Sequence, residues 1–139
     1  KTYLSWDKFY KDSAKLADMV KDKGPFEGII AVARGGFIPA TIVAHRLKIK
    51  KIEMFSLTSY NGDQQQDGFK IHKVFSSDKK WLVIDEISDS GKTAEKLRTF
   101  LPNSHFAVVY ARPKGRPAVD TASEMLPEKD WTVFPWEED

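Results

Sequence analysis

The sequence predicts one α/β domain built on a mostly parallel sheet flanked by helices. Short, continuous apolar runs rich in β-branched residues are typical of strands buried on both faces, as in parallel sheets. A glycine turn and a helical pattern separate the first two runs, which is the order of a βαβ unit. The 139 residues are the size of one domain and can bury a core of their own.

The first two elements are predicted from an amphipathic pattern and an apolar run. Ser5 is a candidate helix N-cap, and apolar residues then recur at three- and four-residue spacing until Gly24-Pro25 ends the pattern. The run at 28–33, Gly-Ile-Ile-Ala-Val-Ala, predicts a strand buried on both faces.

A glycine turn at 34–36 is predicted to lead into a second helix that ends near Leu47. Pro39 is compatible with this helix because it falls in the first turn, where the missing N–H has no intrahelical partner. Residues 52–59 are predicted to form the next strand. Residues 60–70 lack periodicity and contain two glycines, so we expect a mobile loop, which is either a lid over a ligand or the disordered tip of a hairpin.

The second half predicts two further buried strands and a helix. The apolar run at 81–84 predicts a strand, and a helix is expected from about 93–101, where Pro102 ends it. Residues 105–111 predict the next strand, and 131–134 a last short one. Strands alternating with helices indicate a parallel sheet.

Composition and charge exclude several classes of function. The chain has no cysteine, which excludes a disulfide framework and a Cys nucleophile and fits a cytoplasmic location. No apolar run approaches the roughly 20 residues of a membrane span. The 22 bases and 20 acids give a net charge of +2, so no nucleic-acid partner is expected. Residues 118–139 hold seven acids and one base, whereas 1–117 hold 13 acids and 21 bases. This indicates either a solvated surface with an acidic tail or a basic body that attracts an anionic ligand.

The most informative segment is 83–93. An apolar strand there ends in adjacent carboxylates, Asp85 and Glu86, and Asp89 follows shortly before a predicted helix. Backbone N–H groups at the start of a helix bind phosphate. Carboxylates at the carboxyl end of a strand face the ligand crevice of an open α/β sheet, where they can accept sugar hydroxyls or hold Mg²⁺.

Gly91-Lys92-Thr93 also allows an interpretation as the P-loop of an NTPase. That motif requires a glycine five positions before Gly91. The chain has Glu86 there, and its carboxylate would repel the phosphates. We therefore disfavour a P-loop NTPase.

The segment 83–93 resembles the 5-phosphoribosyl-1-pyrophosphate (PRPP) motif of type I phosphoribosyltransferases: an apolar strand, two acids, two spacer residues, then Asp-(Thr/Ser)-Gly-x-Thr. One departure is Glu86, where the motif usually has Asp. Residues 33–36, Ala-Arg-Gly-Gly, resemble the family's pyrophosphate loop. That loop often contains a cis peptide, expected here at Ala33-Arg34. Residues 60–70 take the place of the family's flexible catalytic loop.

Towards the C-terminus, 111–113 and 131–137 resemble the base-binding hood of the family's xanthine–guanine members. The resemblance implies the type I phosphoribosyltransferase fold, as a single domain over 1–139 with a small C-terminal hood. It implies an enzyme of purine salvage that transfers the phosphoribosyl group of PRPP to N9 of xanthine, guanine or hypoxanthine. The products are a nucleoside 5′-monophosphate and pyrophosphate. Family members commonly form homodimers or homotetramers, so we expect a homo-oligomer.

The resemblance also implies roles for residues that bind PRPP. Asp85 and Glu86 would hold the ribose hydroxyls, directly or through Mg²⁺, the expected cofactor. Arg34 and Gly35 would bind the pyrophosphate. Asp89 would accept the proton at purine N7. The 5′-phosphate would be bound by the loop residues Asp89, Ser90, Gly91, Lys92 and Thr93.

Further roles concern the base and the loop. Trp131 would stack on the purine, with backbone carbonyls near Trp131 and Thr132 accepting hydrogen bonds from it. Arg112 stands where the family usually has a Lys that donates to the 6-oxo group. Lys70 is the best basic candidate in the flexible loop, and Glu137 matches an acid that can hold a second Mg²⁺; an exposed terminal acid is the alternative.

A regulator with the same fold, which binds PRPP or nucleotides without catalysis, stays open as an alternative. The intact Asp89 favours the enzyme, because this carboxylate is the family's proton acceptor.

Overall fold

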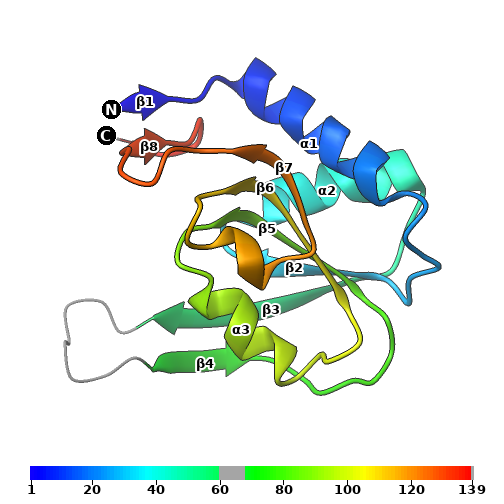
Figure 1. The fold of residues 1–139 in the computed structure, drawn as a ribbon. Helices are drawn as coiled ribbons and strands as arrows, with labels where there is room; N and C mark the ends of the chain where they lie inside the picture. The colour runs from blue at the N-terminus through cyan, green and yellow to red at the C-terminus, as the bar shows by residue number, and fades with distance from the viewer. Residues whose placement is uncertain (60–67, 139) are drawn as a thin grey trace.

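The computed structural model describes residues 1–59 and 68–138. Its main sheet has helices on both faces, with α1 and α2 on one side and α3 on the other (Figure 1). A smaller two-stranded sheet joins the two ends of the chain. The elements in chain order are β1 (Thr2–Tyr3), α1 (Trp6–Val20), β2 (Ile29–Ala33), α2 (Phe37–Leu47), β3 (Ile52–Ser59), β4 (Phe69–Lys73), β5 (Leu82–Ser88), α3 (Lys92–Arg98), β6 (His105–Ala111), the 3₁₀ turn η1 (Arg116–Ala118), β7 (Thr121–Met125) and β8 (Thr132–Val133).

The six-stranded sheet has the order β4-β3-β2-β5-β6-β7. Every neighbouring pair is parallel except β3 and β4, which form an antiparallel pair at one edge. From β2 the chain moves to one side of the sheet through α2, and from β5 it moves to the other side through α3. The boundary between β2 and β5 is therefore the topological switch point, where open α/β sheets bind their ligands.

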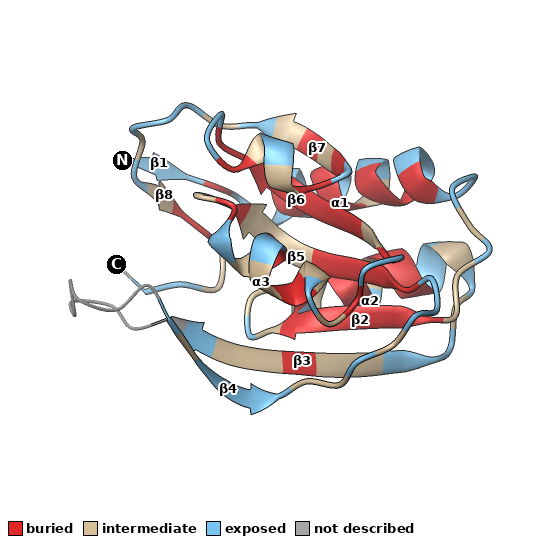
Figure 2. Ribbon diagram, turned by 60° about the horizontal axis from the view of Figure 1, so that its bottom comes forward, coloured by how far each residue is buried: buried red, intermediate tan, exposed pale blue. Residues whose placement is uncertain are grey.

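Alternating side chains of the central strands build two core clusters. Ile29 and Ala31 of β2 pack with α1 and α2, whereas Ile30 and Val32 pack on the α3 side. Because successive side chains of a strand point to opposite faces, a strand buried on both sides is apolar throughout. Figure 2 shows this burial in red along β2, β5 and β6, while β4 at the edge is exposed.

Most of the predicted elements are confirmed. Helix α1 begins at Trp6, and the Ser5 side chain accepts a hydrogen bond from the Lys8 amide at 3.0 Å, as an N-cap does. Pro39 lies in the first turn of α2. The strands predicted at 52–59 and 105–111 have those bounds in the structure.

Three predictions about elements were wrong. The loop expected at 60–70 is shorter at its C-terminal end, because Phe69 and Lys70 lie in β4; residues 60–67 fall outside the described residues. Strand β5 continues to Ser88, two residues beyond the acid pair in which it was expected to end. β4 and β7 were not predicted, because edge strands bury only part of their side chains and their apolar pattern is weak.

The hood also differs from the expectation, because an N-terminal strand completes it. We use "hood" for β1, β8 and the segment 126–138. β1 pairs in parallel with β8, through the Thr2 amide to the Trp131 carbonyl at 2.8 Å and the Leu4 amide to the Val133 carbonyl at 2.9 Å. The hood packs on α1 through an aromatic cluster of Phe9, Phe134 and Trp136.

Among the described residues, no helix combines the length and the apolar character needed to cross a membrane.

Candidate active site

The carboxyl ends of β2, β5 and β6 meet at one edge of the sheet because these strands are parallel neighbours. Arg34 follows the last residue of β2, Asp85 and Glu86 lie in the second half of β5, and Arg112 follows β6. Residues that are distant in the sequence are thereby brought to the switch point. The fold thus gathers carboxylates and guanidinium groups at one place.

The loop between β5 and α3 is fixed by two close backbone approaches. Gly91 has a φ of 90°, a left-handed conformation that disfavours a side chain, and a Cβ there would lie 2.9 Å from the Ala118 Cβ. The Ser88 hydroxyl donates to the Gly115 carbonyl at 2.7 Å. Helix α3 begins immediately after Gly91, so its first-turn N–H groups face the loop. Such N–H groups can donate hydrogen bonds to an anion.

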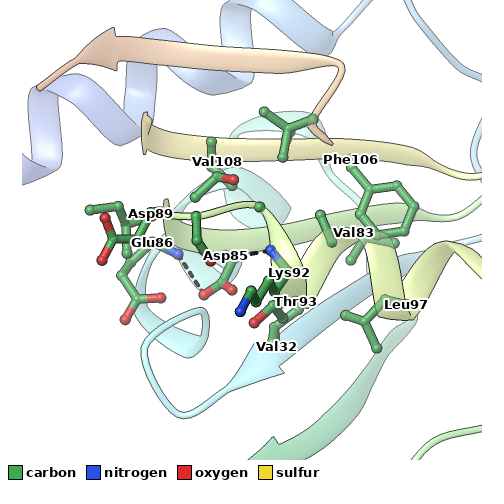
Figure 3. A pocket seen from close by; sticks show the side chains of 17 residues that line it. Val32, Val83, Asp85, Glu86, Asp89, Lys92, Thr93, Leu97, Phe106 and Val108 are labelled. Carbon is green, nitrogen blue, oxygen red and sulfur yellow. Dashed lines mark hydrogen bonds between the residues drawn. The ribbon is translucent and has the colours of Figure 1, made fainter. Parts of the chain in front are cut away.

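Two cavities adjoin each other at this edge. The larger, of about 220 Å³, runs along the β5–α3 loop to an apolar end between α3 and the sheet. Figure 3 shows Asp85, Glu86 and Asp89 on one side of it, and Leu97 and Phe106 at its apolar end. The smaller, of about 160 Å³, is lined by the turn after β2 and by β3 and β4. The two share four lining residues: Val32, Asp85, Glu86 and Thr93.

Glu86 lies directly against the turn after β2. A Cβ on Gly35 would come within 1.6 Å of Glu86 Oε2, so a side chain there would displace the Glu86 carboxylate from its present position. The Ala33-Arg34 peptide is cis, which confirms that expectation, and the Arg34 side chain is exposed. The turn and the carboxylate thus form one wall of the smaller cavity.

Asp85 and Glu86 form an electrostatically unfavourable pair. The Glu86 amide donates to Asp85 Oδ1 at 2.8 Å (Figure 3). Burial, followed by repulsion from the Glu86 carboxylate, raises the pKa of Asp85 well above its ordinary value. A hard cation or sugar hydroxyls between the two carboxylates would relieve this cost, so their oxygens suit Mg²⁺.

The described residues contain no group of three or more His, Cys, Asp or Glu side chains that could hold a metal. Two carboxylates still fit Mg²⁺, because this ion is commonly held by one or two carboxylates together with substrate phosphates and water. Glu137 does not join Asp85 and Glu86 in such a group. Its Oε1 accepts the Phe134 amide at 2.8 Å.

Arg112 makes contacts that sequence reasoning missed. Its side chain is buried, and its Nε lies 3.0 Å from Oδ1 of the largely exposed Asp89. Its Nη1 donates to the Pro127 carbonyl at 2.6 Å, and Nη2 to the Thr132 hydroxyl at 3.4 Å. The one signal in the sequence was Arg in place of the expected Lys, since only Arg presents several donors in a fixed plane.

Two further predicted site residues, Trp131 and Lys70, take different positions relative to the cavities. The Trp131 side chain is 68% exposed, so its ring face is open to a ligand, while its carbonyl accepts the Thr2 amide. Phe69 and Leu57 line the smaller cavity. Lys70 follows Phe69 in β4 and so points to the opposite face of the hairpin. The structure does not bring Lys70 to the cavities.

Comparison with known proteins identifies the family to which this arrangement of residues belongs. Residues 1–139 match the phosphoribosyl transferase domain family. The chain belongs to the phosphoribosyltransferase family. This membership accounts for the presence of the β5–α3 loop, the acid pair and the cis turn at one switch point, and it replaces the P-loop alternative.

Relatives in the phosphoribosyltransferase family cover nearly the whole chain. The sequence is 42% identical over 139 residues to the xanthine-guanine phosphoribosyltransferase of Desulfotalea psychrophila, covering 99% of this chain and 87% of that protein. It is 40% identical over 135 residues to the protein of the same name from Nitratidesulfovibrio vulgaris, covering 96% of this chain and 83% of that protein.

Solved structures agree with the fold. The purine phosphoribosyltransferase from Pyrococcus horikoshii Ot3 superposes with a TM-score of 0.83 at 28% identity, covering 99% of this chain and 94% of that one. The xanthine-guanine-hypoxanthine phosphoribosyltransferase of Helicobacter pylori gives a TM-score of 0.79 at 25% identity, covering 98% and 93%. The chain therefore has the type I phosphoribosyltransferase fold, a mostly parallel α/β sheet flanked by helices.

Proposed function

We propose that the protein is a purine-salvage phosphoribosyltransferase that joins a 6-oxopurine to the phosphoribosyl group of PRPP. The observation that carries this proposal is the pair of adjoining cavities divided by Asp85 and Glu86. PRPP is elongated, with a phosphate at one end, a sugar in the middle and a pyrophosphate at the other end. These three parts match the β5–α3 loop, the acid pair and the turn after β2, in that order. Family membership and the xanthine-guanine relatives support the same activity.

The phosphate ends of PRPP match the two loops. In the proposal, the 5′-phosphate takes hydrogen bonds from the loop at 89–93, where α3 begins. The pyrophosphate meets the turn at Arg34 and Gly35, where the guanidinium offers charge-assisted hydrogen bonds. Asp85 and Glu86 between the loops accept hydrogen bonds from the ribose hydroxyls.

The reaction exchanges one bond for another at C1′ of the ribose. N9 of the purine forms a bond to C1′ while the bond from C1′ to the pyrophosphate oxygen breaks. The proton that the purine loses is accepted by Asp89, and the leaving pyrophosphate takes up the negative charge. Arg34 stabilises that charge, which is electrostatic catalysis without a covalent enzyme intermediate.

Mg²⁺ is part of the proposal as the cofactor. Glu86, together with Asp85, would hold it, and a second ion is assigned to Glu137 only as a proposal. Bound there, the ion would supply positive charge to the pyrophosphate leaving group. The carboxylates themselves keep the ribose oriented between the two loops.

The base would bind next to the hood. Trp131 offers an exposed ring for stacking, and Arg112, which follows β6, contacts Thr132 of β8. Lys70 would act only if the hairpin rearranges, because it points away from the smaller cavity. Preference for xanthine or guanine, a cytoplasmic location and assembly into a homodimer or homotetramer belong to the same proposal.

Incubation with Mg²⁺, PRPP and either xanthine, guanine or hypoxanthine tests the proposal, with pyrophosphate and nucleotide as the measured products. We expect nucleotide from xanthine or guanine, and a loss of turnover when Mg²⁺ is removed with a chelator. Absence of product with all three bases would overturn the enzyme and favour a regulator that binds PRPP without turnover.

A further inference from the structure

Arg112 is a buried cation shared by two parts of the site. It follows the last residue of β6, and its backbone amide donates to the Ser88 carbonyl at 3.1 Å. The Arg112 carbonyl in turn accepts the amides of Gly115 and Arg116, both at 2.9 Å. These backbone bonds hold the base of the side chain firmly. The position of the guanidinium is therefore set by the fold rather than by a ligand.

The guanidinium contacts groups from separate segments. Its Nε faces the Asp89 carboxylate at 3.0 Å, in the loop before α3. Its Nη1 reaches the Pro127 carbonyl at 2.6 Å, at the beginning of the hood, and Nη2 reaches Thr132 in β8. Because the guanidinium is planar and rigid, fixing two of its nitrogens fixes the direction of the third. The hood contacts thereby determine where Asp89 is held.

The solvent exposures of Arg112 and Asp89 indicate that Arg112 positions the Asp89 carboxylate. The Arg112 side chain is 9% exposed, whereas the Asp89 side chain is 73% exposed. An exposed carboxylate samples several rotamers unless a fixed partner selects one. The buried guanidinium is that partner. A lysine ammonium is a compact charge, so it cannot present a fixed fork to both Asp89 and Pro127.

We propose that Arg112 is a positioning residue that holds the Asp89 carboxylate in register with the base-binding hood. This inference rests on the proposed function, in which Asp89 accepts the purine proton and the hood binds the base. It differs from the expected role of Arg112 as a donor to the 6-oxo group, because here Arg112 acts through Asp89. A misplacement of about 1 Å can cost on the order of 100-fold in rate.

A double-mutant cycle on kcat tests the inference, with the variants D89N, R112K and D89N/R112K. We expect R112K to lower kcat on the order of 10- to 100-fold, with the KM for PRPP changed by less than about threefold. In the D89N background, R112K should lower kcat by less than about twofold, because the group it positions is already altered. Equal losses in both backgrounds, or no loss in either, would overturn the inference.

Arg98→Lys is the matched control, because Arg98 also bridges a backbone carbonyl and a carboxylate, those of Ala118 and Asp120, outside the cavities. We expect Arg98→Lys to leave kcat within about twofold. A loss as large as that of R112K would mean that any bridging arginine matters only for folding, and would overturn the inference.

A second measurement needs no turnover. Hydrogen exchange of the segment 126–133 is compared between the unmodified protein and D89N, whose exposed position leaves the fold intact. We expect faster exchange in the hood of D89N, because a coupling free energy between the hood and Asp89 through Arg112 acts equally in both directions. Unchanged exchange would overturn the coupling even if R112K fails to fold. Absence of nucleotide from the unmodified protein would refute the proposed function and leave this measurement interpretable.

Discussion

The β5–α3 loop and the hood both contact Arg112, yet they are built in opposite ways. The loop is one contiguous segment whose shape follows from Gly91 and from the close approach of Gly115. The hood joins segments from both ends of the chain through a two-residue parallel pair, β1 with β8. The loop is anchored to a central strand of a six-stranded sheet, whereas the hood sheet has two strands.

This contrast indicates how each region tolerates change. A short two-stranded pair has little stability of its own and depends on neighbouring packing. We therefore expect substitutions among the residues that line the two cavities to act on PRPP with large effects, and substitutions in the hood to act on the base with graded, smaller effects.

Gly35→Ala should produce the largest effect. Its Cβ would collide with Glu86, which lies 1.6 Å from that position, so the carboxylate must leave its place between the cavities. We expect kcat/KM for PRPP to fall on the order of 100-fold, with the KM for the purine little changed, as measured from initial rates. Adding Glu86→Asp shortens the acid and should recover part of the loss. Unaltered PRPP kinetics in Gly35→Ala would show that the wall is not part of the site.

Trp131→Ala should have an intermediate effect that falls on the base. Stacking of a base on an aromatic ring contributes about 1–3 kcal/mol, so we expect the KM for the purine to rise on the order of 10-fold. The midpoint of thermal unfolding should stay constant because the side chain is 68% exposed. Trp131→Phe, which keeps an aromatic face, serves as the control. A rise in the KM for PRPP instead would contradict the division between loop and hood.

Thr2→Pro should weaken the hood itself. It removes the amide that donates to the Trp131 carbonyl, and one hydrogen bond contributes about 1 kcal/mol. We expect the KM for the purine to rise about three- to fivefold. Thr2→Ala keeps the amide and loses only the hydroxyl contact to Asp130, so it should stay near the unmodified value. Equal values for the two variants would mean that the strand pair does not support base binding.

Asp85→Asn should give the smallest effect, one on stability. Because the pKa of Asp85 is raised by burial and by Glu86, ionising this carboxyl costs free energy in the folded state, and stability falls as the pH rises through that pKa. The variant lacks this cost, so its unfolding temperature should exceed that of the unmodified protein by about a few degrees at neutral pH.

The difference should vanish at acidic pH, where Asp85 is protonated. Thermal unfolding across that range checks this, with the exposed Glu95→Gln as control. An unfolding temperature for Asp85→Asn below that of the unmodified protein at neutral pH would contradict the expected increase.

The parts of the molecule that could be predicted are those determined by local sequence. The strands at 52–59 and 105–111 follow from contiguous patterns, and the structure confirms them. The cis bond at Ala33-Arg34, which the structure also has, was implied only by the family resemblance. β4 and β7 were missed because their side chains pack on one side at most, so the apolar signal is diluted.

The missed contacts of the site depend on distant pairings. The link between Arg112 and Asp89 joins the ends of separate elements, and no pattern in either segment specifies it. Similarly, Lys70 was assigned to a loop because the alternation of the exposed β4 is weak, and its direction became clear only from the register with β3. Tertiary packing rather than propensity decides such positions.

The parallel pairing of β1 with β8 has a consequence for synthesis of the protein on the ribosome. Thr2 contacts Asp130, which lies 128 positions later in the chain. At a translation rate of about 5–20 residues per second, the N-terminal strand waits on the order of 10 s for its partner. All strands of the six-stranded sheet precede Asp130 in the chain. During every round of translation, the nascent chain therefore passes through a stage in which the main sheet can form while the hood is still incomplete.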